Sequence, residues 1–452
     1  STGHTVRSSP AVVDNVVYFG SNDGHLYALN ALTGGLIWNS TAGKRIQSSP
    51  AVADGLVYAG SWDSNVYAFD ASTGSLLWNY TTGDAVISSP SVDAGLVYTG
   101  SFDGNLYALE AASGNSIWVF PTTGPRVTSS PAVSDGVVYA GSEDGNLYAL
   151  NSETGALLWN YTAGGPIHSS PSVTGGIVYV GSDDHNLYAL NASTGALLWT
   201  CTTGDTVRSS PAVVDGVVYV GSYDDHVYAL NASTGTPLWS YRTGGDVDSS
   251  PAVADGVVYV GSLGYEKSFH ALDAATGTLL WDYSMGDWFV YSSPAVSHGM
   301  VYVGCDDGNL YAFGATPGDL PAFDDFDDNM CNSTIWDITG YGGPYTNETN
   351  QRLEITIPSD SSADTFSAGY ASKCALRGDF DIQVDYHLIA WPPENGVRVG
   401  LLIERQPSTC TIERVSYTSP DVSTPGDHYA TNFAGSVLLS ATHDTDGRIR
   451  LV

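Results

Sequence analysis

Hydrophobic and polar positions along residues 1–320 follow one pattern that recurs about every 40 residues. Each unit contains four short runs in which β-branched or aromatic residues alternate with small or polar ones, as in SSPAV, VVYVG, NLYAL and ALLWNY. Turns of the Asp-Gly and Thr-Gly type separate these runs, and no window longer than a strand has a helical period. The pattern therefore predicts an all-β chain built from four-stranded units.

The number of units follows from the tripeptide SSP. Its prolines lie at positions 10, 50, 90, 131, 171, 211, 251 and 294, in steps of 40, 40, 41, 40, 40, 40 and 43 residues. Four strands in about 40 residues is the size of one propeller blade. We expect an eight-bladed β-propeller of four-stranded blades over residues 1–320. Seven blades is the alternative, because the eighth unit degenerates to LYAFGATPGDLPAF, with Ala322 where the others carry tryptophan.

Local chemistry supports the blade assignment. Proline cannot donate to a β-ladder, so SSPAV is expected to be the innermost strand, with one edge facing the central channel. Small residues around each tryptophan, such as Ala28 and Gly34 near Trp38, are expected to let the indole lie flat against a neighbouring peptide plane and lock adjacent blades. The expected blade-docking tryptophans are Trp38, Trp78, Trp118, Trp159, Trp199, Trp239 and Trp281.

Two sequence elements carry a family resemblance. The element AL(N/D)AxTGxLLW resembles the tryptophan-docking motif of PQQ-type propeller repeats, known from quinoprotein alcohol dehydrogenases. The turn VYVGSxDGNLYAL resembles the propeller lipoprotein of the bacterial outer-membrane β-barrel assembly machinery. The resemblance covers residues 3–322 and implies the propeller fold, which hosts several unrelated functions.

The resemblance also allows a test for a redox cofactor. For a quinoprotein dehydrogenase, the resemblance implies three features. They are a disulfide between adjacent cysteines, a tryptophan under the quinone ring, and a Glu/Asn/Asp set that holds calcium beside a catalytic aspartate. This sequence has no Cys-Cys pair, and nearly every unit has the minimal length, without the insertions that carry those ligands. We therefore expect no PQQ and no other redox cofactor.

Aspartates recur at one turn position and raise the question of a metal. They are Asp23, Asp63, Asp103, Asp144, Asp184, Asp224 and Asp307. An aspartate caps its own turn and tolerates left-handed backbone, so turn capping is favoured over metal binding. The sequence contains no HExxH, paired CxxC, GxSxG or phosphate-binding loop. We expect no catalytic residue and no metal ligand in the propeller.

Comparison of the units with one another shows where they differ. Variation concentrates just before SSP and in the turn between the second and third strands, two loop sets that open on the same propeller face. The candidate binding residues there are Arg7, Lys44, Arg45, Gln47, Trp62, Arg126, His168, Arg208, Tyr223, Asp248, Trp288 and Tyr291. Arginine and aromatic residues are typical of binding surfaces, and Trp62, Phe102, Tyr223, Trp288 and Tyr291 are expected to be exposed. The alternative is that these are unconstrained loop positions.

Composition narrows the partner classes. Forty-eight acidic residues against fifteen basic ones give a formal net charge of −33, which argues against binding to nucleic acid backbones. No apolar stretch is long enough to span a membrane, and no signal peptide is visible at Ser1. The acidic, lysine-poor surface suits a secreted or cell-surface protein of archaeal or bacterial origin.

Sequons and cysteines agree with an extracellular location. Glycosylation candidates are Asn39, Asn79, Asn160, Asn191, Asn231, Asn332 and Asn347. One disulfide is expected among Cys331, Cys374 and Cys410, whereas Cys201 and Cys305 replace ordinary repeat positions and are expected to be buried free thiols.

The repeat ends near residue 320, and residues 321–452 follow a different pattern. Runs such as RLEITI, FDIQVDYHLI and VRVGLLIER predict an antiparallel β-sandwich of jelly-roll type. DDFDD, RLEI and GDFDIQVDY resemble concanavalin/laminin-G-like modules. Such modules usually run longer, so an incomplete domain at the C-terminus is one expectation. Four aspartates could hold a structural calcium, with a solvated acidic linker as the alternative: Asp324, Asp325, Asp327 and Asp328.

These observations predict a non-enzymatic binding or assembly scaffold at the cell surface, whose variable face engages a protein or glycan partner. Two alternatives stay open. One is a structural subunit of an extracellular polymer or envelope layer, self-assembled through the C-terminal sandwich. The other is a quinone-dependent or sugar-active enzyme.

Overall fold

The computed structural model divides the chain into two compact units, Ser1–Pro317 and Gly318–Val452. It describes residues 1–263, 267–285 and 288–314 in full, and beyond them the backbone of the strands between Trp336 and Leu451. Every regular element among the described residues is a β-strand, as the sequence predicts.

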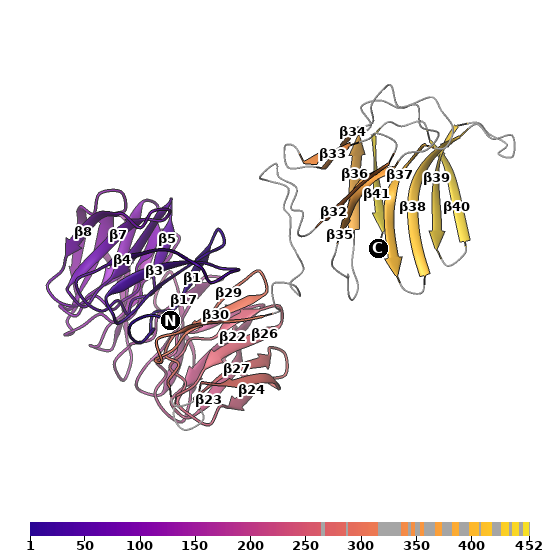
Figure 1. Cartoon of the computed structure of the whole chain (residues 1–452). Coiled ribbons are helices and arrows are strands. Elements are labelled where there is room, and N and C mark those ends of the chain that lie inside the picture. Colours follow the sequence, from indigo (N-terminus) through magenta and orange to yellow (C-terminus); the bar gives the residue numbers. More distant parts are fainter. Residues whose placement is uncertain are drawn as a thin grey trace. The chain divides into compact units, whose positions relative to one another are not determined.

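The first unit is an eight-bladed propeller whose blades follow one another along the chain (Figure 1). Blades one to four contain β1 (Ala11–Val13), β2 (Val16–Gly20), β3 (His25–Asn30), β4 (Leu36–Thr41), β5 (Ala51–Ala53), β6 (Leu56–Gly60), β7 (Asn65–Asp70), β8 (Leu76–Thr81), β9 (Ser91–Asp93), β10 (Leu96–Gly100), β11 (Asn105–Glu110), β12 (Ser116–Pro121), β13 (Ala132–Ser134), β14 (Val137–Gly141), β15 (Asn146–Asn151) and β16 (Leu157–Thr162). Blades five to eight contain β17 (Ser172–Thr174), β18 (Ile177–Gly181), β19 (Asn186–Asn191), β20 (Leu197–Thr202), β21 (Ala212–Val214), β22 (Val217–Ser222), β23 (His226–Asn231), β24 (Pro237–Arg242), β25 (Ala252–Ala254), β26 (Val257–Gly261), β27 (Ser268–Asp273), β28 (Leu279–Ser284), β29 (Ala295–Ser297), β30 (Met300–Gly304) and β31 (Leu310–Phe313).

Each blade is an antiparallel meander, because short turns join strands whose apolar residues alternate between the two faces. The turn between the first two strands is tight: in blade two, Asp54 and Gly55 have φ values of 50° and 75°. Positive φ at both central positions matches the twist of the flanking strands. The cores lie between neighbouring blades, so that β3 packs its inner residues against the next blade.

The serines of SSP form a closed ring around the channel. In every blade the N–H of the second serine donates to the Oγ of the second serine in the next blade, over 2.8–3.0 Å. The last link runs from Ser293 to Ser9, and β29 lies beside β1. Eight links close the circle, so the eight-blade prediction is confirmed and the seven-blade alternative is wrong.

Six of the seven predicted tryptophans lock adjacent blades through residues of the next unit, whereas the turn that would receive Trp281 lies outside the described residues. Trp38 pairs with Ala28 in its own sheet, while its Nε1–H donates to the Ala71 carbonyl of blade two over 2.8 Å. A Cβ added to Gly74 of blade two would lie 2.7 Å from the indole. The glycine that accommodates Trp38 is therefore Gly74, and the same contact recurs at five further blade junctions.

The eighth blade departs from the four-stranded pattern. Among the described residues it has three strands, β29, β30 and β31, and the outer strand is missing from this part of the chain. Ala322, which the repeat aligns with the docking tryptophans, lies outside the described residues.

The second unit also consists of antiparallel strand pairs. Its strands are β32 (Trp336–Tyr341), β33 (Tyr345–Glu348), β34 (Leu353–Thr356), β35 (Ser367–Ser372), β36 (Ile382–His387), β37 (Val397–Arg405), β38 (Ser408–Tyr417), β39 (Gly426–Phe433), β40 (Ser436–Thr442) and β41 (Asp446–Leu451). The pairs are β32 with β35, β33 with β34 and β36 with β41, beside a four-stranded meander from β37 to β40. The sandwich, its calcium site and its disulfide stay predictions, since the side chains concerned are outside the described residues.

Candidate functional site

The two variable loop sets lie on one face of the propeller, as predicted. In each blade one backbone hydrogen bond joins the two variable loops. Its donor is the N–H of the first variable residue of the second turn, which follows a serine in blades one to seven and Cys305 in blade eight, and its acceptor is a carbonyl in the loop that enters the innermost strand. These backbone pairs are Asn22–Thr5, Trp62–Arg45, Phe102–Ala85, Glu143–Arg126, Asp183–Pro166, Tyr223–Thr206, Leu263–Asp246 and Asp306–Phe289. The nearly constant turns are joined to each other in the same way, for example through Ala71 N–H and the Gly55 carbonyl. We call the variable side the channel-mouth face.

The recurrent turn aspartates are structural caps in this geometry. Asp63 accepts hydrogen bonds from the N–H groups of Asn65 and Gly43, over 3.0 and 2.7 Å, and from the Tyr67 hydroxyl over 2.6 Å. Despite desolvation, these bonds lower the pKa of Asp63, while desolvation and the carboxylate raise the pKa of Tyr67 to about 12. The carboxylate oxygens are thus used by donors of the fold, which supports the turn-capping interpretation. Among the fully described residues, no group of three or more His, Cys, Asp or Glu is arranged to hold a metal ion.

Arg208 is the centre of the first cluster at the channel mouth. Its Nε and one terminal nitrogen donate to both oxygens of Asp183 in the preceding blade, over 3.0 and 2.8 Å. His168 Nε2 lies 3.4 Å from the same carboxylate, and His168 Nδ1 lies 2.9 Å from the Thr128 hydroxyl. Desolvation opposes ionisation, but the hydrogen bonds from His168 and Arg208 lower the pKa of Asp183 to about 2. Arg208 therefore has its charge largely neutralised within the protein.

Tyr223 and Asp248 extend this cluster. The Arg208 guanidinium lies 5.4 Å from the centre of the Tyr223 ring, and the Tyr223 hydroxyl donates to Asp248 over 2.8 Å. Burial raises the pKa of Asp248, although the Tyr223 hydroxyl and the positive charge of Arg208 act in the opposite direction. The pairing spans two blade junctions and holds these side chains in fixed positions.

Arg7 forms an equivalent cluster where the last blade meets the first. It makes a two-bond ion pair with Asp306, over 2.9 and 2.7 Å, and its guanidinium lies 4.3 Å from the centre of the Tyr291 ring. The hydrogen bonds to Asp306 raise the pKa of Arg7 even though burial lowers it. Arg7 and Arg208 thus follow one rule: the residue before SSP pairs with the turn aspartate of the preceding blade.

A third cluster is mainly aromatic. The Trp62 indole N–H donates to Gln47 Oε1 over 2.9 Å, and the Trp62 and Phe102 rings meet edge to face with centroids 5.6 Å apart. The Arg126 guanidinium covers Phe102 at 4.6 Å and lies 3.9 Å from Glu143. Contacts of this kind place flat apolar surface beside a cation at the channel mouth.

The prediction that five aromatic residues are exposed is wrong for four of them. Trp62, Phe102, Tyr223 and Tyr291 are half-buried. Trp62, Phe102 and Tyr291 pack against a ring or cation of a neighbouring blade, and Tyr223 packs against Arg208 of its own blade and donates to Asp248 of the next one. Trp288 is the exception, with 51 % of its surface exposed. Lys44, Arg45 and Arg126 are also exposed, so these side chains and Trp288 are the ones directed to solvent.

Sequence comparison between units missed the acidic partners Asp183 and Asp306. A signal for them was present: aspartate occupies the first variable turn position in two units only, and each of these units immediately precedes, around the ring, one with arginine before SSP. The ring order, in which the eighth unit precedes the first, was needed to see the second match. The eightfold repetition of the second serine was likewise a signal for the serine ring.

Other predicted residues are placed as follows. Asn39, Asn79 and Asn160 are exposed on outer strands, and Asn191 and Asn231 are half-buried turn caps that accept hydrogen bonds through Oδ1. Asn332 and Asn347 are outside the residues with described side chains. Cys305 is a buried free thiol as predicted, whereas the free thiol of Cys201 is half-buried, because an outer strand carries it.

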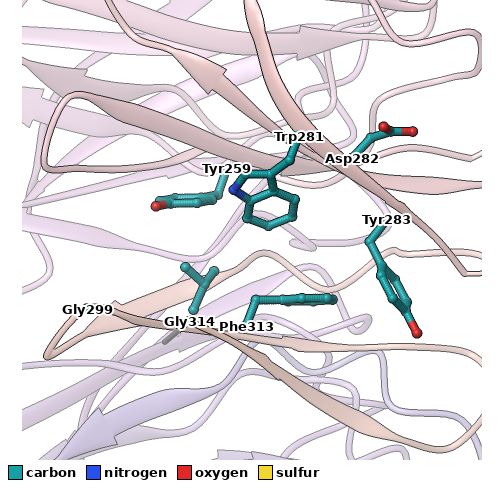
Figure 2. Close-up of a pocket in the computed structure, with 8 residues that line it drawn as sticks. Tyr259, Trp281, Asp282, Tyr283, Gly299, Phe313 and Gly314 are labelled. Carbon is teal, nitrogen blue, oxygen red and sulfur yellow. The ribbon is translucent and has the colours of Figure 1, made fainter. Parts of the chain in front are cut away.

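A pocket of about 310 Å³ lies away from the channel mouth, between blades seven and eight (Figure 2). Tyr259, Trp281, Tyr283 and Phe313 supply its aromatic lining. The Trp281 and Phe313 ring centroids are 5.6 Å apart. In the fully described part of the propeller, no helix is long and apolar enough to cross a membrane.

Comparisons with known proteins point to one family. The model of the family described as outer membrane protein assembly factor BamB matches residues 1–130, 103–210, 164–247 and 185–323. Among curated proteins, the sequence has no match.

Solved structures share the fold at low identity. The computationally designed Ika8 protein is 21% identical, with a TM-score of 0.63 over 70% of this chain and 98% of its own. BamB from Moraxella catarrhalis is 20% identical, with a TM-score of 0.61 over 70% of this chain and 99% of its own. A europium-containing methanol dehydrogenase is 16% identical, with a TM-score of 0.58 over 68% of this chain and 84% of its own.

Proposed function

Since residues 1–323 place the chain in the family described as outer membrane protein assembly factor BamB, we propose that the propeller is a non-enzymatic protein-binding scaffold of the cell envelope. Its binding surface is the channel-mouth face. A protein partner is preferred over a glycan, because the family description concerns protein assembly.

One observation carries the proposal: the side chains that differ between blades gather on one face and are held in place by contacts between blades. Arg208 and Arg7 are fixed by two-bond ion pairs, and the aromatic rings beside them are half-buried. Trp288 and Arg126 then project from an ordered surface. Interfaces gain affinity when aromatic and arginine anchors are already ordered before binding.

A quinone-dependent enzyme is the principal alternative, since a methanol dehydrogenase shares the fold. The residues of the channel mouth do not fit a calcium-bound quinone, because Asp183 and Asp306 are already paired with Arg208 and Arg7. We propose that this chain works without a redox cofactor. A visible absorbance band in the purified protein, or a quinone released on denaturation, would contradict this proposal.

The binding proposal is tested by capture of envelope proteins on the immobilised intact chain, followed by affinity measurement with the purified partner. Trp288→Ala is expected to weaken binding at least about tenfold, because an interface tryptophan is a typical hot spot. Leu32→Ala is the matched control, since Leu32 is exposed to a similar degree, 49 % against 51 %, but lies in a constant turn on the opposite face.

Equal affinities of the wild-type chain, Trp288→Ala and Leu32→Ala would show that the channel-mouth face does not bind the partner. Specific binding on a glycan array, lost in Trp288→Ala, would replace the protein partner with a carbohydrate. Concentration-dependent polymers of the purified chain would favour the structural-subunit alternative.

A further inference from the structure

The outer strands of the blades expose apolar side chains in consecutive pairs. In blade one, Ala28 pairs with Trp38 and Leu29 pairs with Leu36, so Ile37 is the extra residue of a β-bulge. Regular alternation would bury one of two consecutive residues, but the bulge interrupts it, and Leu36 and Ile37 are 59 and 47 % exposed. The same register shift recurs in all seven four-stranded blades of the propeller.

These pairs form an apolar band along the rim of the propeller. The large apolar residues that immediately precede the docking tryptophans are 43–59 % exposed: Leu36, Ile37, Leu76, Leu77, Ile117, Leu157, Leu158, Leu197, Leu198, Leu238, Leu279 and Leu280. Each outer strand is the last of its sheet, and no strand of the described chain pairs with its outer edge. An unpaired edge beside exposed apolar side chains is a template for association with other chains.

The outer strands differ in how this edge is protected. A charged side chain or a proline on an edge strand disfavours pairing with another chain. Three outer strands have one: β12 contains Pro121, β24 contains Pro237 and Arg242, and β28 contains Asp282. In β4, β8, β16 and β20 all residues are uncharged and none is a proline, so these four strands need another form of protection.

The sequons follow this difference. Three of the four strands without charge or proline carry one, at Asn39 in β4, Asn79 in β8 and Asn160 in β16, and β12, β24 and β28 carry none. The fourth strand, β20, has Asn191 of another sequon in the turn that leads into it. Copying of the repeat alone would place sequons without regard to charge and proline. The distribution therefore indicates that sequons replace these two forms of edge protection.

The folded strands present the sequon residues in a form that accepts modification. Asn79 and Thr81 are two residues apart on β8, so their side chains lie on one face, and both residues are exposed. The Asn79 Nδ2 donates to Asn65 Oδ1 over 3.2 Å, and the Thr81 hydroxyl donates to the same oxygen over 2.6 Å. An amide nitrogen has two hydrogens, so Asn79 can carry a substituent and still donate. The same geometry recurs in blade four.

We propose that Asn39, Asn79 and Asn160 carry N-linked glycans, which cover the apolar pairs and the outer edges of β4, β8 and β16. The sugar comes from an oligosaccharide linked to a polyprenyl diphosphate. A bond forms between the asparagine Nδ2 and C1 of the sugar, the bond from C1 to the diphosphate oxygen breaks, the amide loses one proton, and polyprenyl diphosphate leaves. The proposal rests on the envelope location of the proposed function.

The placement of these glycans fits both roles of the propeller surface. On a strand, residues two positions apart are separated by about 7 Å, so a sugar on Asn79 lies beside Leu77. The outer strands lie at the rim, and the channel-mouth face is built from other loops. Glycans at the three sites therefore cover the apolar band while the channel-mouth face stays free for its partner.

Site mapping tests the modification. The chain purified from the cells that produce it is digested, and its peptides are analysed by mass spectrometry with electron-transfer fragmentation. Sugar mass is expected on Asn39, Asn79 and Asn160. Thr81→Ala removes the second sequon without changing Asn79, and it is expected to abolish the sugar on Asn79 only. Thr81→Ser is the matched control, because it keeps the sequon and is expected to keep the sugar.

Sedimentation velocity tests the covering role. The triple variant Thr41→Ala, Thr81→Ala and Thr162→Ala is expected to shift from monomer to larger species as its concentration rises. The triple serine variant at the same positions is expected to stay monomeric. Wild-type chain from which the sugars have been removed enzymatically is expected to behave as the alanine variant does, which separates loss of the glycans from loss of the threonine side chains.

Two results would overturn the proposal. Unmodified asparagine at all three positions would remove the assigned sites, and a monomeric chain after removal of the sugars would remove the covering role. Trp288→Ala lies outside all three sequons and is expected to leave their occupancy unchanged. Capture of the partner by a chain without sugars would show that failure here leaves the proposed function intact, so the two failures are distinguishable.

Discussion

At the scale of single residues, the channel mouth is organised by pairs that cross from one blade to the next. A side chain just before SSP lies near the first variable turn residue of the preceding blade, and this proximity decides its partner. Arg208 with Asp183 and Arg7 with Asp306 are the two strongest pairs. Two-bond contacts between arginine and carboxylate combine charge with fixed geometry. These residues therefore fix the positions of side chains on the channel-mouth face, and their charges are largely neutralised.

The Asp183 pair predicts a specific loss of stability in acid. The pKa of Asp183 is about 2 in the folded protein, below its ordinary value of 3.8. Its ionised form therefore stabilises the fold above about pH 4, and this contribution of about 2 kcal/mol is lost as the pH falls from 4 towards 2. In chemical denaturation at several pH values, Asp183→Asn is expected to reduce the free energy of unfolding at pH 7 and to flatten its fall between pH 4 and 2.

The control for this experiment is Asp54→Asn, which changes an exposed turn residue on the opposite face. Asparagine accepts positive φ as aspartate does, so the turn is retained. If Asp183→Asn and Asp54→Asn had the same pH dependence as the wild-type chain, the pair with Arg208 would contribute nothing to acid stability.

At the scale of the elements, each blade is completed by the one that follows it. The turn between the third and fourth strands presents a carbonyl and a glycine to the tryptophan of the preceding blade. The glycine has two separate functions, since it adopts positive φ and leaves room for a flat ring. Blade docking is thus repeated chemistry between neighbours, as in other repeat proteins.

A pair of glycine variants in blade six separates these two functions. Gly235→Ala is expected to lower stability by about 2 kcal/mol or more, because its Cβ would lie 2.6 Å from the Trp199 ring at positive φ. Gly216→Ala has a similar φ and open space around the Cβ, so only the backbone strain of about 1 kcal/mol is expected. Thermal unfolding measures the difference, and equal shifts of the two melting temperatures would mean that the indole contact is not limiting.

At the scale of the whole molecule, the propeller is a closed ring in which the two ends of the repeat meet. Ser293 N–H donates to Ser9, and the Ser292 hydroxyl donates to the Ser8 carbonyl, over 2.9 and 3.2 Å. The inner serine ring is therefore complete, although blade eight has only three strands among the described residues. The hydrogen bonds between the inner strands close the ring, and this closure does not require the outer strand of blade eight.

Because the serine ring is closed, equivalent serines are expected to contribute equally to the stability of the propeller. Ser9→Ala at the closing junction and Ser210→Ala in blade six each remove one acceptor from the ring, leaving a backbone N–H unpaired, and each is expected to cost about 1–2 kcal/mol. Differential scanning calorimetry of the intact chain measures both. A cost for Ser210→Ala without one for Ser9→Ala would show that the ring is open between blades eight and one.

Much of the fold could be predicted from the sequence because its determinants repeat locally. The period of about 40 residues, the alternation within each run, and the turn residues predict four-stranded blades without knowledge of distant contacts. The same repetition identifies the docking tryptophans, the capping aspartates and the face on which variable loops lie. The candidate site was predicted as a set of positions on that face.

Only the tertiary structure decided which side chains of different units contact each other. The burial of Trp62 and the partners of Arg7 and Arg208 depend on side chains that another blade contributes. Within one unit these side chains are separated from their partners, and at the ring closure the partners lie 299 residues apart, as Arg7 and Asp306 do. The sequence alone determined what each blade is, since strand, turn and cap are local; the folded ring determined which side chains meet, because their contacts arise only when blades pack against each other.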